Sequence, residues 1–410
     1  MHKNTLYPGN LALQREKVVR FSRLVLAFIY LISGVILGLI LLEAILRCNP
    51  TILQRGIALP VPVDPSLTVQ NFDVRFSDAD VFHWRPDLVR PIPESADRLE
   101  SRVTYETDEF GFRNPGPIPP RVEVVVLGRS ISLAGHLSDP WPALLASRLN
   151  WWVLNLSQPG SGIKVKRNFL ERFGLPRQPR WVIVEVVPSI DFIGDHLVPS
   201  TVSQQMVVPV LQQLARRWMT EKPAGTDTAI YPLSVDLPDR KVDLTCCLHY
   251  LNFFSLDRNT LEHSLDWANY SKELLKIVAD ARSHNACVAL LYVPTKPDVY
   301  FPLARNPEQL NPTLKDTIPL RLSSAGWIEP DPHAAISVAE IRQNALVGRA
   351  LVESFAREND LLFIDPNAAL VQSVLAGQDP FMVYDSHWNQ LGHQIVAETI
   401  FESLEKAACP

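Results

Sequence analysis

The longest apolar run of the chain lies near its N-terminus. Residues 24–42 carry no charge, and the run stays apolar through Leu46 with Glu43 as its one interruption. This length suits a membrane-spanning helix, whereas the apolar region of a cleaved signal peptide has only about 7 to 15 residues. Five basic residues precede the run and two follow it closely, which favours a cytoplasmic N-terminus. The pattern predicts a cytoplasmic tail at 1–23 and a transmembrane signal anchor at 24–46, with the remainder facing outward.

Five short and mostly apolar runs follow residue 120. Such runs are typical of parallel strands that are covered on both faces. Amphipathic stretches predict helices at 168–173, 269–283, 338–358 and 390–404, and one more that Asp139 caps. Alternating strands and helices predict a doubly wound α/β sheet, with the active site beyond the carboxyl ends of the strands. The predicted strands are 122–127, 152–156, 181–187, 287–293 and 361–364.

Two stretches do not follow this alternation. Residues 47–120 are rich in proline, which favours extended connections over helices, and they predict a stalk and a lead-in segment. The interval 193–266 separates the third strand from the fourth and predicts an insertion or a lid. The folded domain is therefore expected at 121–408.

Composition excludes several classes of protein. The chain has 410 residues, of which 47% are hydrophobic and 20% charged, so most of it is expected to fold. Its net charge of −5 does not suit a nucleic-acid partner. Five cysteines are too few for a disulfide scaffold, and we interpret all five as ordinary thiols. No cysteine or histidine spacing indicates zinc, and no metal or cofactor is predicted.

Polar residues with catalytic potential follow the first and last predicted strands. The first strand ends in Gly128-Arg129-Ser130, where the hydroxyl of Ser130 can face the sheet edge. His387 can take the proton of that hydroxyl, and Asp385 can orient the imidazole. The alternative interpretation makes these residues parts of a turn and a helix cap. Glu185 lies within a buried strand, so it is either paired or close to the site with a raised pKa, and we favour pairing.

These residues resemble the sequence blocks of the SGNH/GDSL hydrolase superfamily, over most of residues 100–405. Residues 126–130 are similar to the Gly-Asp-Ser block, 155–160 to the second block, and 385–389 to the last one. The last block has an Asp-x-His-Trp form, which resembles polysaccharide O-acetyltransferases of the alginate-acetylation type. The resemblance implies a flavodoxin-like fold.

The resemblance also implies roles for individual residues. Ser130 becomes the nucleophile, His387 the base and Asp385 its orienting group. Gly160 closes the second block, and its backbone N–H would hold the oxyanion.

Two positions depart from the family pattern. Arg129 replaces the Asp of the first block; it can form a salt bridge in place of a lost carboxylate contact, add positive charge near the oxyanion, or mark a degenerate site. We favour the structural role. Ile190 occupies the position of the third-block Asn and cannot donate to an oxyanion, whereas Ser189 can.

The sequence thus predicts a serine-dependent acyl-ester hydrolase or O-acyltransferase in a bacterial cytoplasmic membrane, with its domain in the periplasm. An acylated small molecule or glycan is the expected substrate, and polysaccharide-assembly proteins are candidate partners. The alternative is a catalytically impaired relative that binds glycan or takes part in polysaccharide assembly.

Overall fold

The computed structural model describes a defined part of the chain. Residues Asp64–Ser200 and Lys222–Pro410 form one compact unit, and Met1–Val63 with Thr201–Glu221 form another. The central sheet, the helices that cover it and the candidate site belong to the first unit. The described residues are 30, 33–35, 37–38, 74–76, 103–105, 108, 110, 112–134, 137–158, 161–193, 230–305, 319–331, 333–382 and 386–409.

The predicted anchor and most of the predicted stalk lie outside the described residues. Within 24–46, only residues 30, 33–35, 37 and 38 are described, and they are helical. In the described part of the chain, no helix has both the length and the apolar character that crossing a membrane requires. The tail and anchor therefore stay predictions.

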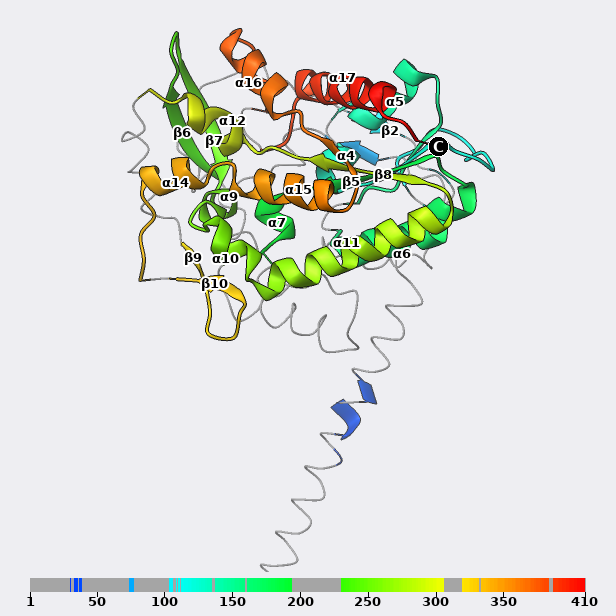
Figure 1. Cartoon of the computed structure of the whole chain (residues 1–410), viewed down its shortest axis with the longest axis horizontal. Coiled ribbons are helices and arrows are strands. Elements are labelled where there is room, and N and C mark those ends of the chain that lie inside the picture. Colours follow the sequence, from blue (N-terminus) through cyan, green and yellow to red (C-terminus); the bar gives the residue numbers. More distant parts are fainter. Residues whose placement is uncertain are drawn as a thin grey trace, which may run out of the picture. The chain divides into compact units, whose positions relative to one another are not determined.

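A five-stranded parallel sheet forms the centre of the unit (Figure 1). All five predicted strands are confirmed, with their ends shifted by no more than two residues. The spatial order is β11-β8-β5-β3-β4, so the first strand of the sheet lies between the second and the third. This is the flavodoxin-like order, in which ligands bind where the strand order reverses. The strands are β3 (Val124–Leu127), β4 (Val153–Asn155), β5 (Trp181–Val186), β8 (Cys287–Tyr292) and β11 (Leu362–Ile364).

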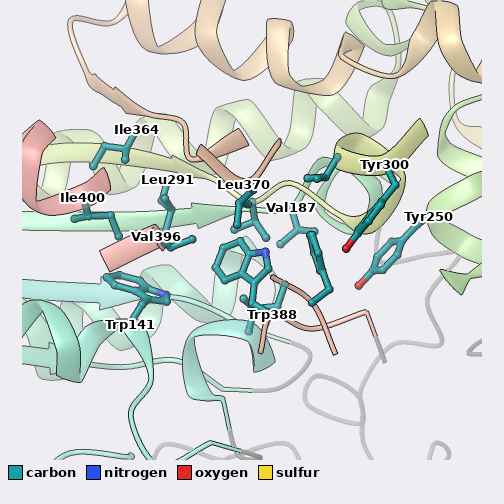
Figure 2. Packing of buried hydrophobic residues seen from close by; sticks show 14 of the residues in the cluster. Trp141, Val187, Tyr250, Leu291, Tyr300, Ile364, Leu370, Trp388, Val396 and Ile400 are labelled. Carbon is teal, nitrogen blue, oxygen red and sulfur yellow. The ribbon is translucent and has the colours of Figure 1, made fainter. Parts of the chain in front are cut away.

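Helices cover both faces of this sheet. On one face, Val124 and Val126 pack with side chains of α5 (Trp141–Leu149), α16 (Asn367–Leu375) and α17 (Gln390–Lys406). On the other, the alternate residues of β3 pack with α6 (Ile163–Phe169), α11 (Leu265–Ser283) and α15 (Val347–Glu358). Figure 2 shows part of the first of these cores, which includes Trp141, Leu291, Trp388 and Ile400.

Several helix ends differ from the sequence prediction. The segment 338–358 is two helices, α14 (Val338–Asn344) and α15, rather than one. Pro140 is the N-cap of α5, so the expectation that Asp139 caps this helix is wrong. The segment 168–173 belongs to the end of α6 and a following π-helical turn, Leu170–Gly174. Helix α11 begins earlier than predicted, because Ser264 accepts a hydrogen bond from the Trp267 N–H and caps it there.

The predicted insertion is partly described. It contains an antiparallel hairpin of β6 (Ile230–Asp236) and β7 (Lys241–Cys247), followed by α9 (Leu248–Phe253) and α10 (Arg258–Glu262). Leu251 and Phe254 are buried in the same core cluster as β3. Residues 194–229 lie outside the described part, and a role for the insertion as a lid stays a prediction.

Short elements complete the described structure. Helices α4 (Ser130–Leu133), α7 (Pro188–Asp191) and α12 (Lys296–Tyr300) each follow a strand of the sheet at its carboxyl end. Two further antiparallel pairs, besides β6 and β7, lie outside the central sheet. They are β1 (Val74–Phe76) with β2 (Val103–Tyr105), and β9 (Leu320–Leu322) with β10 (Ile328–Pro330).

A disulfide joins Cys287, at the start of β8, to Cys409 beyond the last helix. The expectation that all five cysteines are ordinary thiols is therefore wrong for this pair. The two residues are 122 positions apart in sequence, and nothing in their local patterns links them. The disulfide ties the C-terminal end of the chain to the central sheet.

Candidate active site

The nucleophile candidate lies on a tight turn at the carboxyl end of β3. Ser130 is the first residue of α4, only two residues after the glycine that follows the strand. A side chain at Gly128 would have its Cβ 2.7 Å from the Cβ of Ser132 and would also meet the Ser157 hydroxyl. Glycine is therefore required for this turn, which leaves the Ser130 side chain half-buried and accessible.

The structure brings the base candidate to this serine. Nε2 of His387 lies 2.9 Å from Oγ of Ser130, although the residues are 257 positions apart. That distance is suitable for proton transfer between a nucleophile and its base. Because Nε2 contacts the hydroxyl, an orienting carboxylate would have to bind at Nδ1. The geometry matches the expected one, while the catalytic role of the pair stays a prediction.

The loop that carries His387 is fixed at both ends. Phe381 and Trp388 form an antiparallel bridge, and the Met382 N–H donates to the carbonyl oxygen of His387 at 3.0 Å. The side chain of Trp388 is buried against the sheet (Figure 2). Asn389 caps α17 and also donates to the carbonyl of Phe381. These contacts fix the backbone beside His387, whose imidazole contacts Ser130 at the end of β3.

Two predicted site residues lie outside the described residues. They are Asp385, the expected orienting carboxylate, and Gly160, the expected oxyanion donor. Their described neighbours Ser386 and Ser161 are both buried. The Ser161 hydroxyl donates to the carbonyl oxygen of Gly128 at 2.7 Å, which joins the second sequence block to the nucleophile turn.

Arg129 forms a buried ion pair rather than facing the oxyanion. Its Nε and Nη2 donate to Oδ1 of Asp191 at 2.9 and 2.6 Å, and the side chains are 10% and 0% exposed. Lys166 Nζ lies 3.6 Å from the other oxygen of Asp191. Of the three alternatives for Arg129, this geometry supports the structural one.

The charges in this cluster shift one another. Burial favours the neutral form of Asp191, but Arg129 and Lys166 outweigh it, and its pKa lies below the usual value. For Lys166 burial dominates, and its pKa is lowered despite the attraction of Asp191. Asp191 is therefore a stable partner for the guanidinium, which stays charged at any working pH.

Glu185 lies at the end of β5, next to the nucleophile turn. Its side chain is 0% exposed, and its carboxylate accepts hydrogen bonds from the Arg129 backbone N–H at 3.1 Å and from the Ser132 hydroxyl. Burial raises the pKa of Glu185, and the charge of Lys166 opposes this. The two alternatives for this residue, pairing and proximity to the site with a raised pKa, are both observed.

Arg113 supports the segment that follows the nucleophile, and sequence reasoning did not assign it this role. Its guanidinium donates to four backbone carbonyls at 2.5 to 2.9 Å, those of residues 133, 134, 137 and 138. Arg113 lies within residues 47–120, the predicted stalk and lead-in segment. The sequence does not indicate these partners, because Arg113 binds them only through their backbone carbonyls.

Two buried hydroxyls near the strand ends have no hydrogen-bond partner among the described residues. They belong to Ser157, which follows β4, and to Ser189 in α7. Ser189 was predicted as a substitute for the missing third-block donor, and its side chain is in fact buried at the end of β5. Ile190 is adjacent and cannot donate. The role of Ser189 as an oxyanion donor stays a prediction.

A metal centre is not evident in the described ranges, where no group of three or more His, Cys, Asp or Glu side chains is placed to hold an ion.

Comparisons with known proteins give similar solved structures only. No protein-family model and no curated protein matches the chain. The solved structures include the acetyl xylan esterase AlAXEase, with 11% identity and a TM-score of 0.35, over 69% of this chain and 100% of that one. A lipolytic protein of the G-D-S-L family from Veillonella parvula has 11% identity and a TM-score of 0.35, with coverage of 70% and 99%.

A third similar structure is a catalytic mutant of Axe2, an acetylxylan esterase from Geobacillus stearothermophilus. It has 14% identity and a TM-score of 0.34, and the match covers 70% of this chain and 95% of that one. Values of this size do not establish the family of this chain. The strand order of the sheet remains the basis of the fold assignment.

Proposed function

We propose that this protein is a serine-dependent acyl-ester hydrolase or O-acyltransferase. The observation that supports the proposal most directly is the 2.9 Å contact between Ser130 Oγ and His387 Nε2 at the carboxyl edge of a parallel sheet. A serine hydroxyl is a weak nucleophile by itself, and an adjacent base activates it. Asp385 is the proposed orienting group, and Gly160 with the Ser130 backbone N–H are the proposed oxyanion donors.

The reaction proceeds in two halves. Ser130 Oγ attacks the acyl carbonyl while His387 Nε2 takes the hydroxyl proton, and the negative charge moves to the carbonyl oxygen. Collapse of this intermediate breaks the ester bond, and His387 returns the proton to the departing alcohol. Water, or the hydroxyl of a glycan, then attacks the acyl-enzyme, His387 takes its proton, and Ser130 leaves with that proton.

We place this reaction outside the cytoplasmic membrane. The uncharged run at 24–42 and the basic residues before it support a membrane anchor with a cytoplasmic N-terminus and an outward-facing domain. The Cys287–Cys409 disulfide supports an oxidising compartment, because such bonds are rare in the reducing cytosol. An acylated glycan or envelope component is the proposed substrate, and proteins of polysaccharide assembly are proposed partners.

Hydrolysis and transfer can be separated by following the acyl group. The full-length chain is mixed with a chromogenic acetyl ester, with and without an oligosaccharide acceptor, and alcohol and acetate are both measured. A hydrolase releases equal amounts of the two under either condition, whereas a transferase releases less acetate than alcohol when the acceptor is present. If the folded wild type cleaves the ester no faster than the Ser130→Ala variant, the proposal is contradicted.

A further inference from the structure

The carboxylate of Glu185 contacts the nucleophile turn on both sides of Ser130. One oxygen accepts the backbone N–H of Arg129, and the other accepts the hydroxyl of Ser132. The nucleophile lies between these two contacts in sequence. Strand pairing explains the position, because Val184 is in register with Leu127 and Glu185 follows at the point where β3 turns into α4.

Both contacts require an acceptor on Glu185. A backbone N–H can only donate. The Ser132 hydroxyl accepts the indole N–H of Trp141 at 2.9 Å, so its own hydrogen is directed to the carboxylate. A carboxylate satisfies the two donors at once. A carboxamide of the same shape would place an NH₂ group against one of them.

The charge of this carboxylate is compensated locally. Glu185 and Asp191 face two cations, Arg129 and Lys166, and all four residues are more than nine-tenths buried. Lys166 Nζ also donates to the backbone carbonyl of Glu185 at 2.6 Å. Two positive and two negative groups thus form a neutral cluster under the nucleophile turn, which lets an acidic residue occupy the interior of a parallel sheet.

We propose that Glu185 is a positioning residue, which holds Ser130 in line with His387 through its hydrogen bonds to the residues on either side. The proposal rests on the proposed function for its consequence in catalysis, but the positioning itself concerns the turn alone. Misplacement of a nucleophile lowers the rate of the chemical step far more than it weakens substrate binding.

The test compares Glu185→Gln with Asp266→Asn in the full-length chain. Asp266 is also buried and also accepts a backbone N–H, from Ile328 at 2.8 Å, but it lies on α11 away from the turn. We expect Glu185→Gln to lower kcat for acetyl-ester cleavage by about 10- to 100-fold, with KM changed by less than about threefold. Asp266→Asn should leave both constants close to wild type.

A second readout does not depend on activity. The amides of Leu133 and Ala134 donate to the carbonyls of Arg129 and Ser130, so their hydrogen exchange reports on the order of the turn. Exchange in a peptide covering 128–134 should accelerate about tenfold or more in Glu185→Gln and stay unchanged in Asp266→Asn. Unchanged exchange together with unchanged kcat in Glu185→Gln would overturn the proposal.

The experiments distinguish failure of the proposed function from failure of the proposed role of Glu185. A wild type without ester cleavage contradicts the proposed function, and the exchange comparison then decides the positioning role alone. If Glu185→Gln does not fold, Ser132→Ala provides the second variant, because it removes one of the two contacts and leaves the charges intact. It should accelerate exchange in 128–134, and wild-type exchange in this variant would overturn the proposal.

Discussion

Arg129 and Asp191 form a buried ion pair, in which each charge is stabilised by the other instead of by water. The guanidinium makes two hydrogen bonds to one carboxylate oxygen, and the Val187 N–H donates to the other at 2.8 Å. Removing one partner from such a pair leaves the other charge buried without compensation, which typically costs about 3 to 5 kcal/mol. An exposed ion pair contributes much less to stability, and that smaller contribution does not describe this buried pair.

The first prediction concerns Arg129. Arg129→Ala should lower the free energy of unfolding by about 3 kcal/mol or more, because Asp191 keeps only Lys166 as a cation. Arg129→Asp should be worse, since it places a third carboxylate beside Asp191 and Glu185. Urea unfolding of the variants measures the loss, and Arg148→Ala, which removes an exposed ion pair with Glu398, serves as the control. A gain in activity or stability in Arg129→Asp would instead indicate a degenerating site.

At the scale of elements, the segment after β8 contains a buried acidic cap. Thr295 and Asp298 form a capping box at the start of α12, in which the Asp298 carboxylate accepts the N–H and the hydroxyl of Thr295. Burial raises the pKa of Asp298 to about 6, and the hydrogen bonds from Thr295 oppose the shift. The carboxyl group therefore holds its proton more tightly in the folded chain than in the unfolded one.

The second prediction follows from this pKa. With a folded pKa above the unfolded value, the contribution of Asp298 to stability is present at low pH and is lost as pH rises through about 6. Asp298→Asn keeps an acceptor and does not titrate. The unfolding free energy of the wild type should fall relative to this variant by up to about 3 kcal/mol between pH 4 and pH 7. If the difference in unfolding free energy between the wild type and Asp298→Asn does not change with pH, the raised pKa of Asp298 is contradicted.

The strands were predictable because each is a local apolar run, and the same run is buried on both faces in the structure. The helix break inside 338–358 was not predictable from periodicity, because the apolar positions continue on both sides of Ala345 and Leu346. The hairpin of β6 and β7 was also missed. It is stabilised by pairing between its own strands, and it lies in a stretch that breaks the strand and helix alternation.

At the scale of the whole molecule, the remaining features depend on contacts between distant residues. Ser130 and His387 were predicted because their sequence blocks resemble known ones. The partner of Arg129 is 62 residues away, and that of Cys287 is 122 residues away. No local pattern specifies such partners, since a buried carboxylate or a lone cysteine can pair with any suitable group that the topology brings close.

The third prediction concerns orientation in the membrane. A reporter that works only in the periplasm, fused after residue 60, should be active, because the basic residues lie before the apolar run. A reporter that works only in the cytoplasm, fused at the same residue, should be inactive. The reverse result would place the domain in a reducing compartment and would conflict with the Cys287–Cys409 disulfide.

The activation of Ser130 by His387 can be tested by covalent labelling of the full-length chain with a fluorophosphonate probe, which reacts with activated serines. We expect labelling of the wild type and of Ser147→Ala, which removes an exposed serine of α5. Ser130→Ala should abolish labelling and His387→Ala should reduce it about a hundredfold or more, with melting temperatures unchanged. A folded wild type that is not labelled, or a Ser130→Ala variant that still is, would contradict the assignment of Ser130 as an activated nucleophile.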